Sequence, residues 1–476
     1  NPQGAESVER RSGAKGNAEQ PHMRRTQSRE SMSQRLSRVR EAAKQRKKER
    51  FTALFHLLTA EALENAFLSL SRKAAAGVDG VRWKDYAENL KVNIADLHRR
   101  LHQGSYRAQP GRRHYIPKAD GKQRPLGIAS LEDKIVQYAL VKILNAVYEN
   151  DFMGFSYGFR PGRSQHNALD ALATGLVRTN VNWVLDADIS QFFDKVSHEW
   201  LIRFIEHRIG DQRVIRLIRK WLTAGTSEEG EWRASEEGTP QGAVISPLLA
   251  NIYLHYVFDL WAHQWRRRHA TGNVVMVRYA DDIVIGFDKR IDAQCFRIAM
   301  QRRLKEFGLT VHPKKTRLME FGRFAAENRA SRGKGKPETF NFLGFTHISG
   351  KDRSGRFMLI RKTRRDRMTA TLKAIKDGLR KRWHYSIPEQ GKWLRRVVQG
   401  YLNYHSVPGN YPMMRKFRIY VTDLWRRALR RRSQQDDTTW TKANRLAAVW
   451  LPKVRVLHPW PVERFTARHP RQEPGA

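Results

Sequence analysis

Apolar and polar positions follow two different periods along the chain, and the clearest strand pattern lies at residues 274–287. Two apolar runs rich in β-branched residues, 274–277 and 283–285, flank the adjacent acids Asp281 and Asp282. Such runs on either side of a short polar segment are typical of a β-hairpin. The pattern therefore predicts a hairpin with two carboxylates at its turn.

Three further segments have the character of strands. Residues 114–128 carry Asp-Gly between two short extended stretches, which predicts a hairpin with basic arms. Residues 182–189 form an apolar run in which Asp186 and Asp188 are two positions apart, so a regular strand would present both on one face. The run at 340–345 is predicted to be a single strand.

Spacings of three and four residues predict helices in most of the remaining chain. A basic helix is expected from Ser31, with its apolar stripe continued by Phe51 to Leu58. Further helices are expected at residues 63–70, 131–148, 198–221, 246–260 and 296–304, and through the basic segment that begins at residue 361. Residues 1–30 have little apolar surface to bury, which predicts disorder.

Charge changes this picture more than composition does. The 476 residues include 89 Lys and Arg against 47 Asp and Glu, a formal net charge of +42, so a polyanion is the natural partner. No apolar run approaches the length of a membrane span, and the basic residues are spread over the whole chain. The single cysteine, Cys295, excludes an internal disulfide and fits a reducing cytoplasm.

The acids of the predicted hairpin are the first candidates for chemistry. Asp281 and Asp282 repel each other, and desolvation raises the cost of keeping both ionised unless a cation lies between them. A divalent metal ion would remove that cost, and either Asp186 or Asp188 is the expected partner. The alternative is that Asp favours turns through hydrogen bonds to the local backbone.

Several basic and aromatic segments are candidates for phosphate contact. Lys118 and Arg124 lie on opposite arms of the predicted basic hairpin and could reach one phosphate group. Residues 155–164 alternate aromatics with Gly and Arg, and the segment after residue 361 mixes Arg, Lys, Trp and Tyr; both compositions suit stacking and backbone contacts. The alternative for residues 155–164 is a packed turn with two surface arginines. For the segment after residue 361 it is a helical bundle with tryptophans in its core and arginines in solvent.

Taken in order, these motifs resemble the group II intron reverse transcriptases, also called maturases. The order is a basic hairpin, an Asp-bearing strand, a Gly-Thr-Pro-Gln-Gly loop before a helix, a Tyr-Ala-Asp-Asp hairpin and a Phe-Leu-Gly-Phe strand. The resemblance implies an α+β right-hand polymerase, with fingers and palm built from an antiparallel sheet and helices and followed by a helical thumb, domain X. The implied parts are a basic, partly disordered extension (1–50), fingers and palm (51–350), thumb (351–435) and a C-terminal extension without an endonuclease (436–476).

The resemblance also assigns roles to individual residues. Asp188, selected over Asp186 by the family pattern, joins Asp281 and Asp282 as catalytic and metal-binding carboxylates, with the backbone carbonyl of Ile189 as a further ligand. Two Mg²⁺ ions are implied, with Mn²⁺ as a substitute. The implied nucleotide-binding residues are Lys118, Arg124, Gln241 and Phe193, the last as a steric gate against the ribose 2′-hydroxyl. Candidate RNA-binding residues come instead from the basic and aromatic segments, and they are Arg160, Arg163, Lys315, Arg395, Arg396, Tyr401 and Tyr404.

The expected function is RNA-directed DNA synthesis together with assistance to intron splicing. The expected partners are the group II intron RNA in a lariat ribonucleoprotein, an RNA template with a DNA primer, target DNA and deoxynucleoside triphosphates, in the cytoplasm of a bacterium and without a membrane. Oligomeric state is left open. Two alternatives remain at this stage: an RNA-binding maturase with a vestigial polymerase site, and a cellular reverse transcriptase of a retron, defence or CRISPR-associated system.

Overall fold

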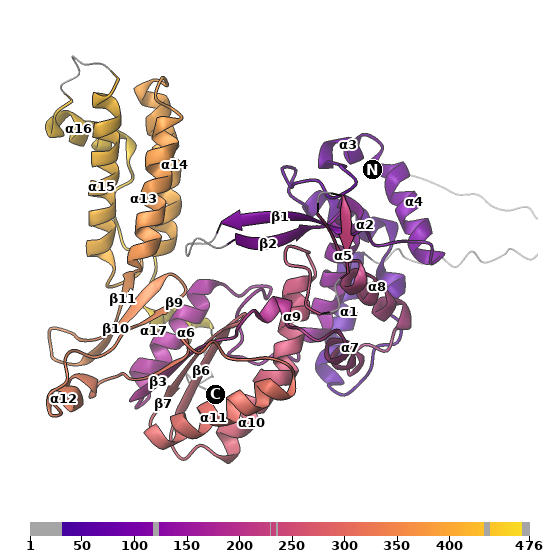
Figure 1. The fold of residues 1–476 in the computed structure, drawn as a ribbon, viewed down its shortest axis with the longest axis horizontal. Coiled ribbons are helices and arrows are strands. Elements are labelled where there is room, and N and C mark those ends of the chain that lie inside the picture. The colour runs from indigo at the N-terminus through magenta and orange to yellow at the C-terminus, as the bar shows by residue number, and fades with distance from the viewer. Residues whose placement is uncertain (1–30, 118–122, 229, 235–236, 433–437, 469–476) are drawn as a thin grey trace, which may run out of the picture.

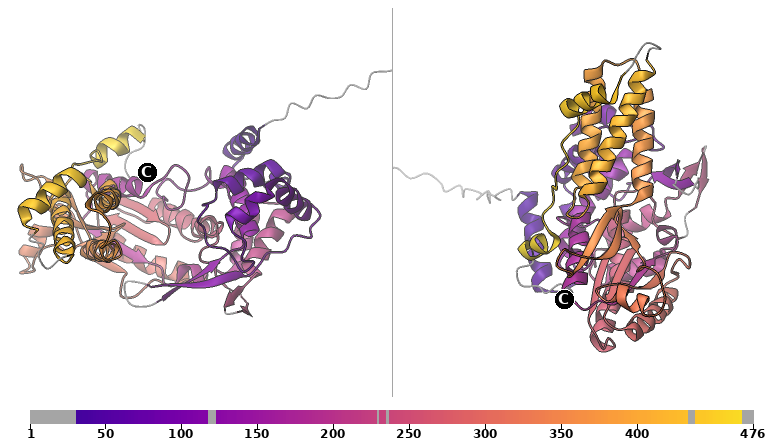
Figure 2. Two further views of the ribbon diagram at one scale, coloured as in Figure 1. Left: turned by 90° about the horizontal axis from the view of Figure 1, so that it is seen from above. Right: turned by 90° about the vertical axis from the view of Figure 1, so that its left-hand side faces the viewer.

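The structure is a computed structural model, and it describes residues 31–117, 123–228, 230–234, 237–432 and 438–468. Figure 1 shows a group of helices at one end of an elongated molecule, a sheet at its centre and an upright helix bundle at the other end. The view from above in Figure 2 agrees, with the bundle and the N-terminal helices at opposite ends. The described chain thus forms three successive regions.

The N-terminal region is helical. Its helices are α1 (Met32–Gln45), η1 (Phe55–Leu57), α2 (Ala60–Ser69), α3 (Trp83–Glu88), α4 (Leu90–His102), α5 (Leu131–Tyr148), α7 (His198–Glu206) and α8 (Gln212–Thr223). The predicted helix start at Ser31 is confirmed by a capping box in which Ser31 and Gln34 satisfy each other's backbone N–H groups. The predicted continuation of that stripe from Phe51 to Leu58 is wrong. Phe51 forms a bridge to Ile209, and only one 3₁₀ turn follows.

The predicted basic hairpin is present as β1 (Gly111–Pro117) and β2 (Gln123–Ile128). The two strands are antiparallel, with Ile116 opposite Arg124. Two short strands, β4 (Thr226–Glu228) and β5 (Glu231–Arg233), extend the sheet in the order β2-β1-β4-β5. Figure 1 shows the hairpin projecting from the helical region toward the bundle, above the central sheet.

The central sheet holds the predicted acids. Its strand order is β6 (Val274–Tyr279), β7 (Asp282–Phe287), β3 (Trp183–Asp188) and β8 (Arg317–Glu320), and all neighbours are antiparallel. The other elements around it are α6 (Gln165–Arg178), η2 (Phe192–Asp194), α9 (Ser246–Leu254), the π-helical segment η3 (His255–Asp259), α10 (Leu260–Arg268), α11 (Arg290–Glu306) and α12 (Ala325–Ala330). The hairpin predicted at 274–287 is confirmed by β6 and β7.

The two faces of the central sheet enter different cores because successive strand residues point to opposite sides. Val184 and Val284 join the core beneath α6, whereas Leu185 and Ile285 join the core that includes Phe296 of α11. The period of two continues to the strand ends, so Asp186, Asp188 and Asp282 belong to the α6 face. The register of the sheet therefore sets the side on which the acids emerge.

A third, smaller sheet links the central sheet to the bundle. It contains β9 (Phe340–Phe342), β10 (Phe345–Lys351) and β11 (Phe357–Thr363), all antiparallel. The single strand predicted at 340–345 is wrong, because Leu343 and Gly344 take positive φ angles of 45° and 80° and reverse the chain. Phe342 and Phe345 end up facing each other across the turn.

The C-terminal region is the helix bundle expected from the basic and aromatic segment. Its helices are α13 (Arg365–Arg380), α14 (Ile387–His405), α15 (Tyr411–Arg430) and α16 (Trp440–Trp450). Trp425 is fully buried in its core, where its indole N–H donates to the Gln390 side chain at 2.9 Å. The chain then returns to the central region, where α17 (Pro461–Arg468) lies against α6.

The described chain is therefore an α+β protein with mainly antiparallel sheets, as predicted, although β1 and β4 pair in parallel. The helix predicted at 198–221 is two helices, α7 and α8, and the helix predicted at 246–260 includes the π-helical turn η3. Within the described ranges, no helix is both long and apolar enough to cross a membrane.

Candidate active site

The acids predicted from the sequence meet at one end of the central sheet. Asp188 is the last residue of β3, and the antiparallel register places it directly opposite Asp282, the first residue of β7. Asp281 precedes it in the turn that joins β6 to β7. The carboxylates of two strands and one turn are thus brought to a single edge.

The turn that carries Asp281 has a strained backbone. Ala280 has a φ of 56°, in the left-handed region that residues with a side chain rarely enter. A neighbouring segment holds the turn: the Tyr157 N–H donates to the Arg278 carbonyl at 2.8 Å, and a Cβ atom on Gly158 would lie 2.3 Å from the Ala280 nitrogen. Position 158 therefore requires glycine for the backbone to pack this closely against the turn.

A buried ion pair supports the turn from the opposite face of the sheet. Arg278 and Asp259 are both fully buried, and the guanidinium donates to the two carboxylate oxygens at 2.7 and 2.6 Å. The same guanidinium donates to the Ala280 carbonyl at 2.9 Å and to the Ser156 hydroxyl at 2.7 Å. Asp259 is supplied by the π-helical segment η3, a distortion that often marks functional regions. The pair fixes the strained residue directly before Asp281.

The acids are electrostatically unsatisfied. Desolvation within the cleft, followed by repulsion from Asp281 and Asp188, raises the pKa of Asp282 to about 7. Desolvation also raises the pKa of Asp281 above its ordinary value, and Asp188 adds to the effect. The Lys315 ammonium donates to the Asp188 carboxylate at 2.8 Å. A cation already lies at the acid cluster, and it compensates Asp188 more directly than Asp282.

These carboxylates fit a hard divalent cation by their chemistry, because such ions prefer carboxylate oxygens and would relieve the repulsion that raises the pKa of Asp282. In the described parts of the chain, however, no three His, Cys, Asp or Glu side chains are already gathered around a common metal position. Lys315 also occupies one oxygen of Asp188. A metal ion bound to that oxygen would displace the Lys315 ammonium.

Asp281 and Asp282 line a cleft of about 520 Å³ that extends between the central sheet, the β9-β10-β11 sheet and the base of the bundle. Arg124 of β2 and Phe193 also line it. The Arg124 side chain donates to the Gln241 side-chain carbonyl at 3.0 Å, and Gln241 donates in turn to Asp194 at 2.5 Å. Gln241 is thus joined to both Arg124 and the segment that carries Phe193.

The loop that carries Gln241 is built around glycines. Gly242 has a φ of 108°, and a Cβ atom there would lie 3.0 Å from the Gly127 carbonyl oxygen. The Gly127 N–H donates to the Gln241 carbonyl at 2.6 Å, so the loop is bound to β2 by its backbone as well as by its side chain. Lys118, predicted on the other arm of the hairpin, lies outside the described residues.

The comparisons with known proteins agree with this site. A family described as reverse transcriptase (RNA-dependent DNA polymerase) matches residues 116–347, the segment that includes all three acids. Protein YkfC of Escherichia coli is 43% identical over 206 residues, covering 42% of this chain and 54% of its own. The group II intron-encoded protein LtrA of Lactococcus lactis subsp. cremoris is 37% identical over 223 residues, covering 46% and 37%. The putative COX1/OXI3 intron 1 protein of Saccharomyces cerevisiae is 26% identical over 393 residues, covering 68% and 46%.

These matches support a group II intron reverse transcriptase and maturase, and the matched segment holds the acid cluster. The chain spans about half or less of the length of these three relatives. The family pattern explains why Asp188, rather than Asp186, is the expected catalytic acid of β3. Desolvation raises the pKa of Asp186 to about 6, and its register partner is Arg317 of β8, away from the turn. Ile189 follows Asp188 directly, with its side chain buried.

The residues predicted to bind RNA have diverse surroundings. Arg160 is buried, and its guanidinium is occupied by Glu149 and by the carbonyls of Met153 and Ser156. These contacts give Arg160 a structural role and leave it little capacity for RNA. Arg163 donates to the Gly154 carbonyl at 2.5 Å and remains partly accessible.

The predicted RNA contacts of the bundle differ in the same way. Arg395 donates to the carbonyls of Val449 and Trp450 and so joins α14 to α16, whereas Arg396 is exposed. Tyr401 is stacked on Phe417 with ring centroids 3.7 Å apart. Tyr404 lines the cleft. Arg396 and Tyr404 therefore keep the access that RNA binding needs, and for all these residues the RNA role stays a prediction.

Sequence reasoning missed the residues that hold the acid turn. Arg278 and Asp259 lie 19 positions apart, and Gly158 is more than 100 positions from Ala280. One signal was present: a lone Arg in the apolar strand 274–279 has to be paired if it is buried. That signal predicts a partner without saying which acid supplies it.

Proposed function

We propose that the chain is an RNA-directed DNA polymerase encoded by a group II intron and that it also acts as a maturase on intron RNA. The observation that carries the proposal is the shared cleft of Asp281, Asp282, Arg124 and Phe193, with Asp188 opposite Asp282 in the sheet. Acids for metal ions, a guanidinium for phosphates and an aromatic ring for the sugar are the parts that nucleotidyl transfer requires. The match to the reverse transcriptase family supports the same reaction.

The regions of the fold are interpreted as parts of a right-hand polymerase. Residues 51–350 would form fingers and palm, with the β1-β2 hairpin in the fingers and the central sheet in the palm. Residues 351–435 would form the thumb, or domain X, and 436–476 an extension of it. Figure 1 supports this interpretation, because the hairpin and the bundle rise on either side of the central sheet.

Asp188, Asp281 and Asp282 would hold two Mg²⁺ ions, or Mn²⁺ in their place, with help from the Ile189 carbonyl. Bound divalent ions would activate the primer 3′-hydroxyl and stabilise the leaving pyrophosphate. The protein's own part begins with the turn: the Arg278–Asp259 pair and Gly158 fix the backbone of Ala280, and so fix where the two turn carboxylates point. Such preorganisation lowers the cost of reaching the reactive geometry.

The remaining cleft residues would select and orient the nucleotide. Arg124 would bind the triphosphate with its planar fork, and Gln241 would hold that fork in position through its side-chain carbonyl. Phe193 would exclude the ribose 2′-hydroxyl and favour deoxynucleotides. Lys118 is proposed as a second triphosphate contact on the sequence motif alone.

The maturase role would rest on the bundle and the basic surface. The proposed partners are the intron RNA of a lariat ribonucleoprotein, an RNA template with a DNA primer, target DNA and deoxynucleoside triphosphates, in a bacterial cytoplasm. The net charge of +42 supports binding of nucleic acid whose affinity falls steeply with added salt.

Primer extension on an RNA template with deoxynucleotides and Mg²⁺ tests the polymerase. We expect synthesis by the wild type and a loss on the order of 10³-fold in Asp188→Asn and Asp281→Asn, since each removes a proposed metal-binding charge. Asp186→Asn is the matched control, because it neutralises an acid on the same face of the same strand, and it should retain most activity.

Two outcomes would contradict the proposal. An equal loss of primer extension in Asp186→Asn and Asp188→Asn would contradict the proposal that Asp188 is the catalytic acid of β3. Absence of DNA synthesis by folded wild-type protein on several templates would contradict the polymerase activity and favour an RNA-binding maturase.

A further inference from the structure

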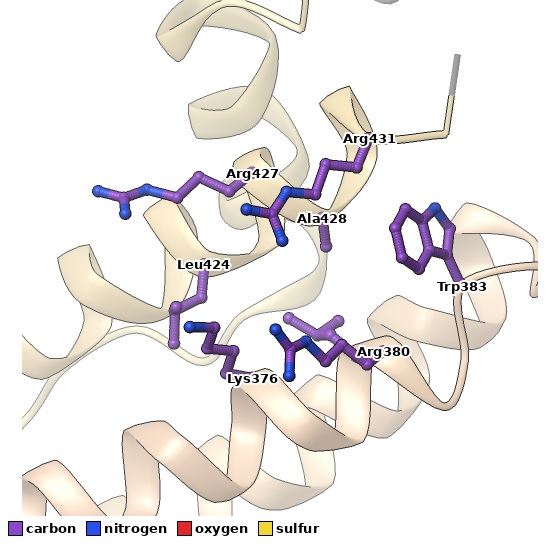
Figure 3. Close-up of a pocket in the computed structure, with 8 residues that line it drawn as sticks. Lys376, Arg380, Trp383, Leu424, Arg427, Ala428 and Arg431 are labelled. Atoms are coloured by element: carbon purple, nitrogen blue, oxygen red, sulfur yellow. The ribbon is translucent and has the colours of Figure 1, made fainter. Parts of the chain in front are cut away.

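A pocket outside the cleft lies at the far end of the helix bundle, between α13 and α15 (Figure 3). Its volume is about 100 Å³. Leu379, Leu424 and Ala428 supply apolar surface, and Trp383, in the turn after α13, stands at one end. A cavity of ~150 Å³ accepts a benzene ring, so this open pocket is sized for the edge of one flat ring and its substituent.

Cations surround this apolar surface. In Figure 3, Arg380 from α13 and Arg431 after α15 point toward each other across the pocket, with Lys376 near them. The ion pair between Arg380 and Asp377 spans 3.9 Å, and Arg427, which also lines the pocket, pairs with Asp423 at 2.7 Å. Among the described residues, Lys376 and Arg431 have no ion-pair partner. Two guanidinium groups that face one another repel, and an anion placed between Arg380 and Arg431 would relieve that repulsion.

We infer that this pocket binds a single unpaired nucleotide of a folded RNA, with its phosphate between Arg380 and Arg431 and its base against Trp383 and the apolar surface. A guanidinium fork matches phosphate geometry, and a base gains from stacking on an aromatic ring. The choice of RNA rests on the proposed function, whereas the pocket geometry does not depend on catalysis. A duplex cannot enter a pocket of this size, which is why an unpaired nucleotide is the ligand.

The pocket is separate from the cleft. Arg367, near the start of α13, lines the cleft, and Arg380 ends the same helix 13 residues later. At 1.5 Å per residue the two lie about 20 Å apart along the helix axis. A nucleotide held at the tip would therefore belong to RNA that reaches well past the site of synthesis, and it would position that RNA without contacting the acids.

Anisotropy titration with a labelled RNA hairpin tests the inference. The full-length protein is titrated with a hairpin carrying one bulged adenosine and with the same hairpin fully paired. We expect the wild type to prefer the bulged hairpin by roughly tenfold, as one stacked base would give. The double variant Arg380→Gln/Arg431→Gln and the variant Trp383→Leu should lose that preference.

The matched control is Lys381→Gln/Arg430→Gln. It also removes two positive charges, but at the positions next to Arg380 and Arg431. Both side chains are exposed, and neither lines the pocket. This control should keep the bulge preference, and its overall affinity should fall only through the general loss of charge. All variants should keep wild-type primer extension, because the cleft is about 20 Å away.

Three outcomes would overturn the inference. They are equal binding of both hairpins by the wild type, equal loss of preference in the pocket and control variants, and displacement of the bulged hairpin by polyglutamate as readily as by unlabelled bulged RNA. The last outcome would indicate an acidic protein as the partner. A bulge preference in a wild type that fails at primer extension would leave this pocket intact and contradict only the proposed polymerase.

Discussion

Arg278, beneath the turn that carries Asp281, and the cations at the tip of the bundle differ in burial and in pairing with acids. Arg278 is fully buried, and its guanidinium is satisfied by Asp259, Ala280, Ser156 and Asn251. At the tip, by contrast, Arg380 is exposed and reaches a carboxylate only at 3.9 Å. A buried charge has to be paired, whereas an exposed charge is solvated by water and stays available to bind a ligand.

The contrast shows that net charge alone does not locate a binding surface. Several of the 89 basic residues are neutralised inside the fold, among them Arg160 by Glu149 and Arg208 by Asp151. The cations available to RNA are those that the fold leaves without close acids. If this is correct, removing an acid should have a large effect on stability in the buried regions and a small one at the tip.

The largest effect is expected for Asp259→Asn. The substitution leaves the Arg278 charge fully buried without its carboxylate, and breaking such a pair costs about 3–5 kcal/mol. Urea denaturation should report that loss in the free energy of unfolding, and primer extension should fall as the Ala280 turn loosens. A loss below about 1 kcal/mol would show that the buried pair is not what holds the turn.

A similar loss of about 3 kcal/mol is expected for Asp170→Asn. Asp170 of α6 is buried between Arg361 of β11, at 3.4 Å, and Arg464 of α17, so the substitution leaves two cations facing each other. It should also release the C-terminal segment, which limited proteolysis near residues 451–468 would detect. Arg464→Gln is the control. It keeps the fully buried Arg361–Asp170 pair and should destabilise less, and an equal loss would contradict this explanation.

Acid should destabilise the same region through His347. Burial, with a smaller effect from Arg361, lowers the pKa of His347 to about 3 from an ordinary value of 6.5. Between pH 6.5 and 3 the His347 imidazole is protonated in the unfolded chain and neutral in the folded chain. The free energy of unfolding therefore falls as pH falls. From pH 7 to pH 5 this residue alone should cost roughly 2 kcal/mol.

His347→Phe removes that proton while keeping a ring stacked on Phe340, where the centroids are now 4.8 Å apart. The variant should lose roughly 2 kcal/mol less than the wild type between pH 7 and pH 5, measured by chemical denaturation at both values. Identical pH dependence of the two proteins would show that His347 is not held neutral by burial.

Local patterns predicted much of what lies around the cleft. The continuous apolar runs in 274–287 and 182–189 were enough to predict β6, β7 and β3, because each strand has one face in each core. The strand period of two predicted that Asp186 and Asp188 share a face. A one-residue shift in register would have moved those acids to the other side of the sheet.

Features that depend on distant contacts could not be predicted. The turn at Leu343 and Gly344 breaks an apolar run that reads as one strand. Its contact, in which the Tyr404 hydroxyl donates to the Leu343 carbonyl at 2.8 Å, comes from 61 positions away. Arg160 lies in a motif whose composition suits RNA contact, yet its side chain is buried and paired with Glu149. The pocket at the tip joins residues of α13 and α15 that are some 50 positions apart, and only the bundle brings them together.

A smaller effect is expected at the acid cluster itself. Lys315 is mostly exposed and pairs with Asp188, and an exposed ion pair contributes at most about 1 kcal/mol. Lys315→Ala should therefore tighten Mn²⁺ binding by up to about fivefold, because the ion no longer displaces the ammonium. Calorimetric titration of the nucleic-acid-free protein would measure this, with Lys314→Ala as the control. Equal changes in both variants would indicate a general charge effect.

The smallest effect on stability is expected for Asp377→Asn at the bundle tip. Its ion pair with Arg380 is long and exposed, so the free energy of unfolding should change by less than about 0.5 kcal/mol. Arg380 is freed from a competing acid, so affinity for the bulged RNA hairpin should rise by about twofold to threefold, a change absent from Asp377→Glu. A loss of stability comparable to that of Asp259→Asn would show that the tip cations are also neutralised by the fold, and the contrast between the two regions would fail.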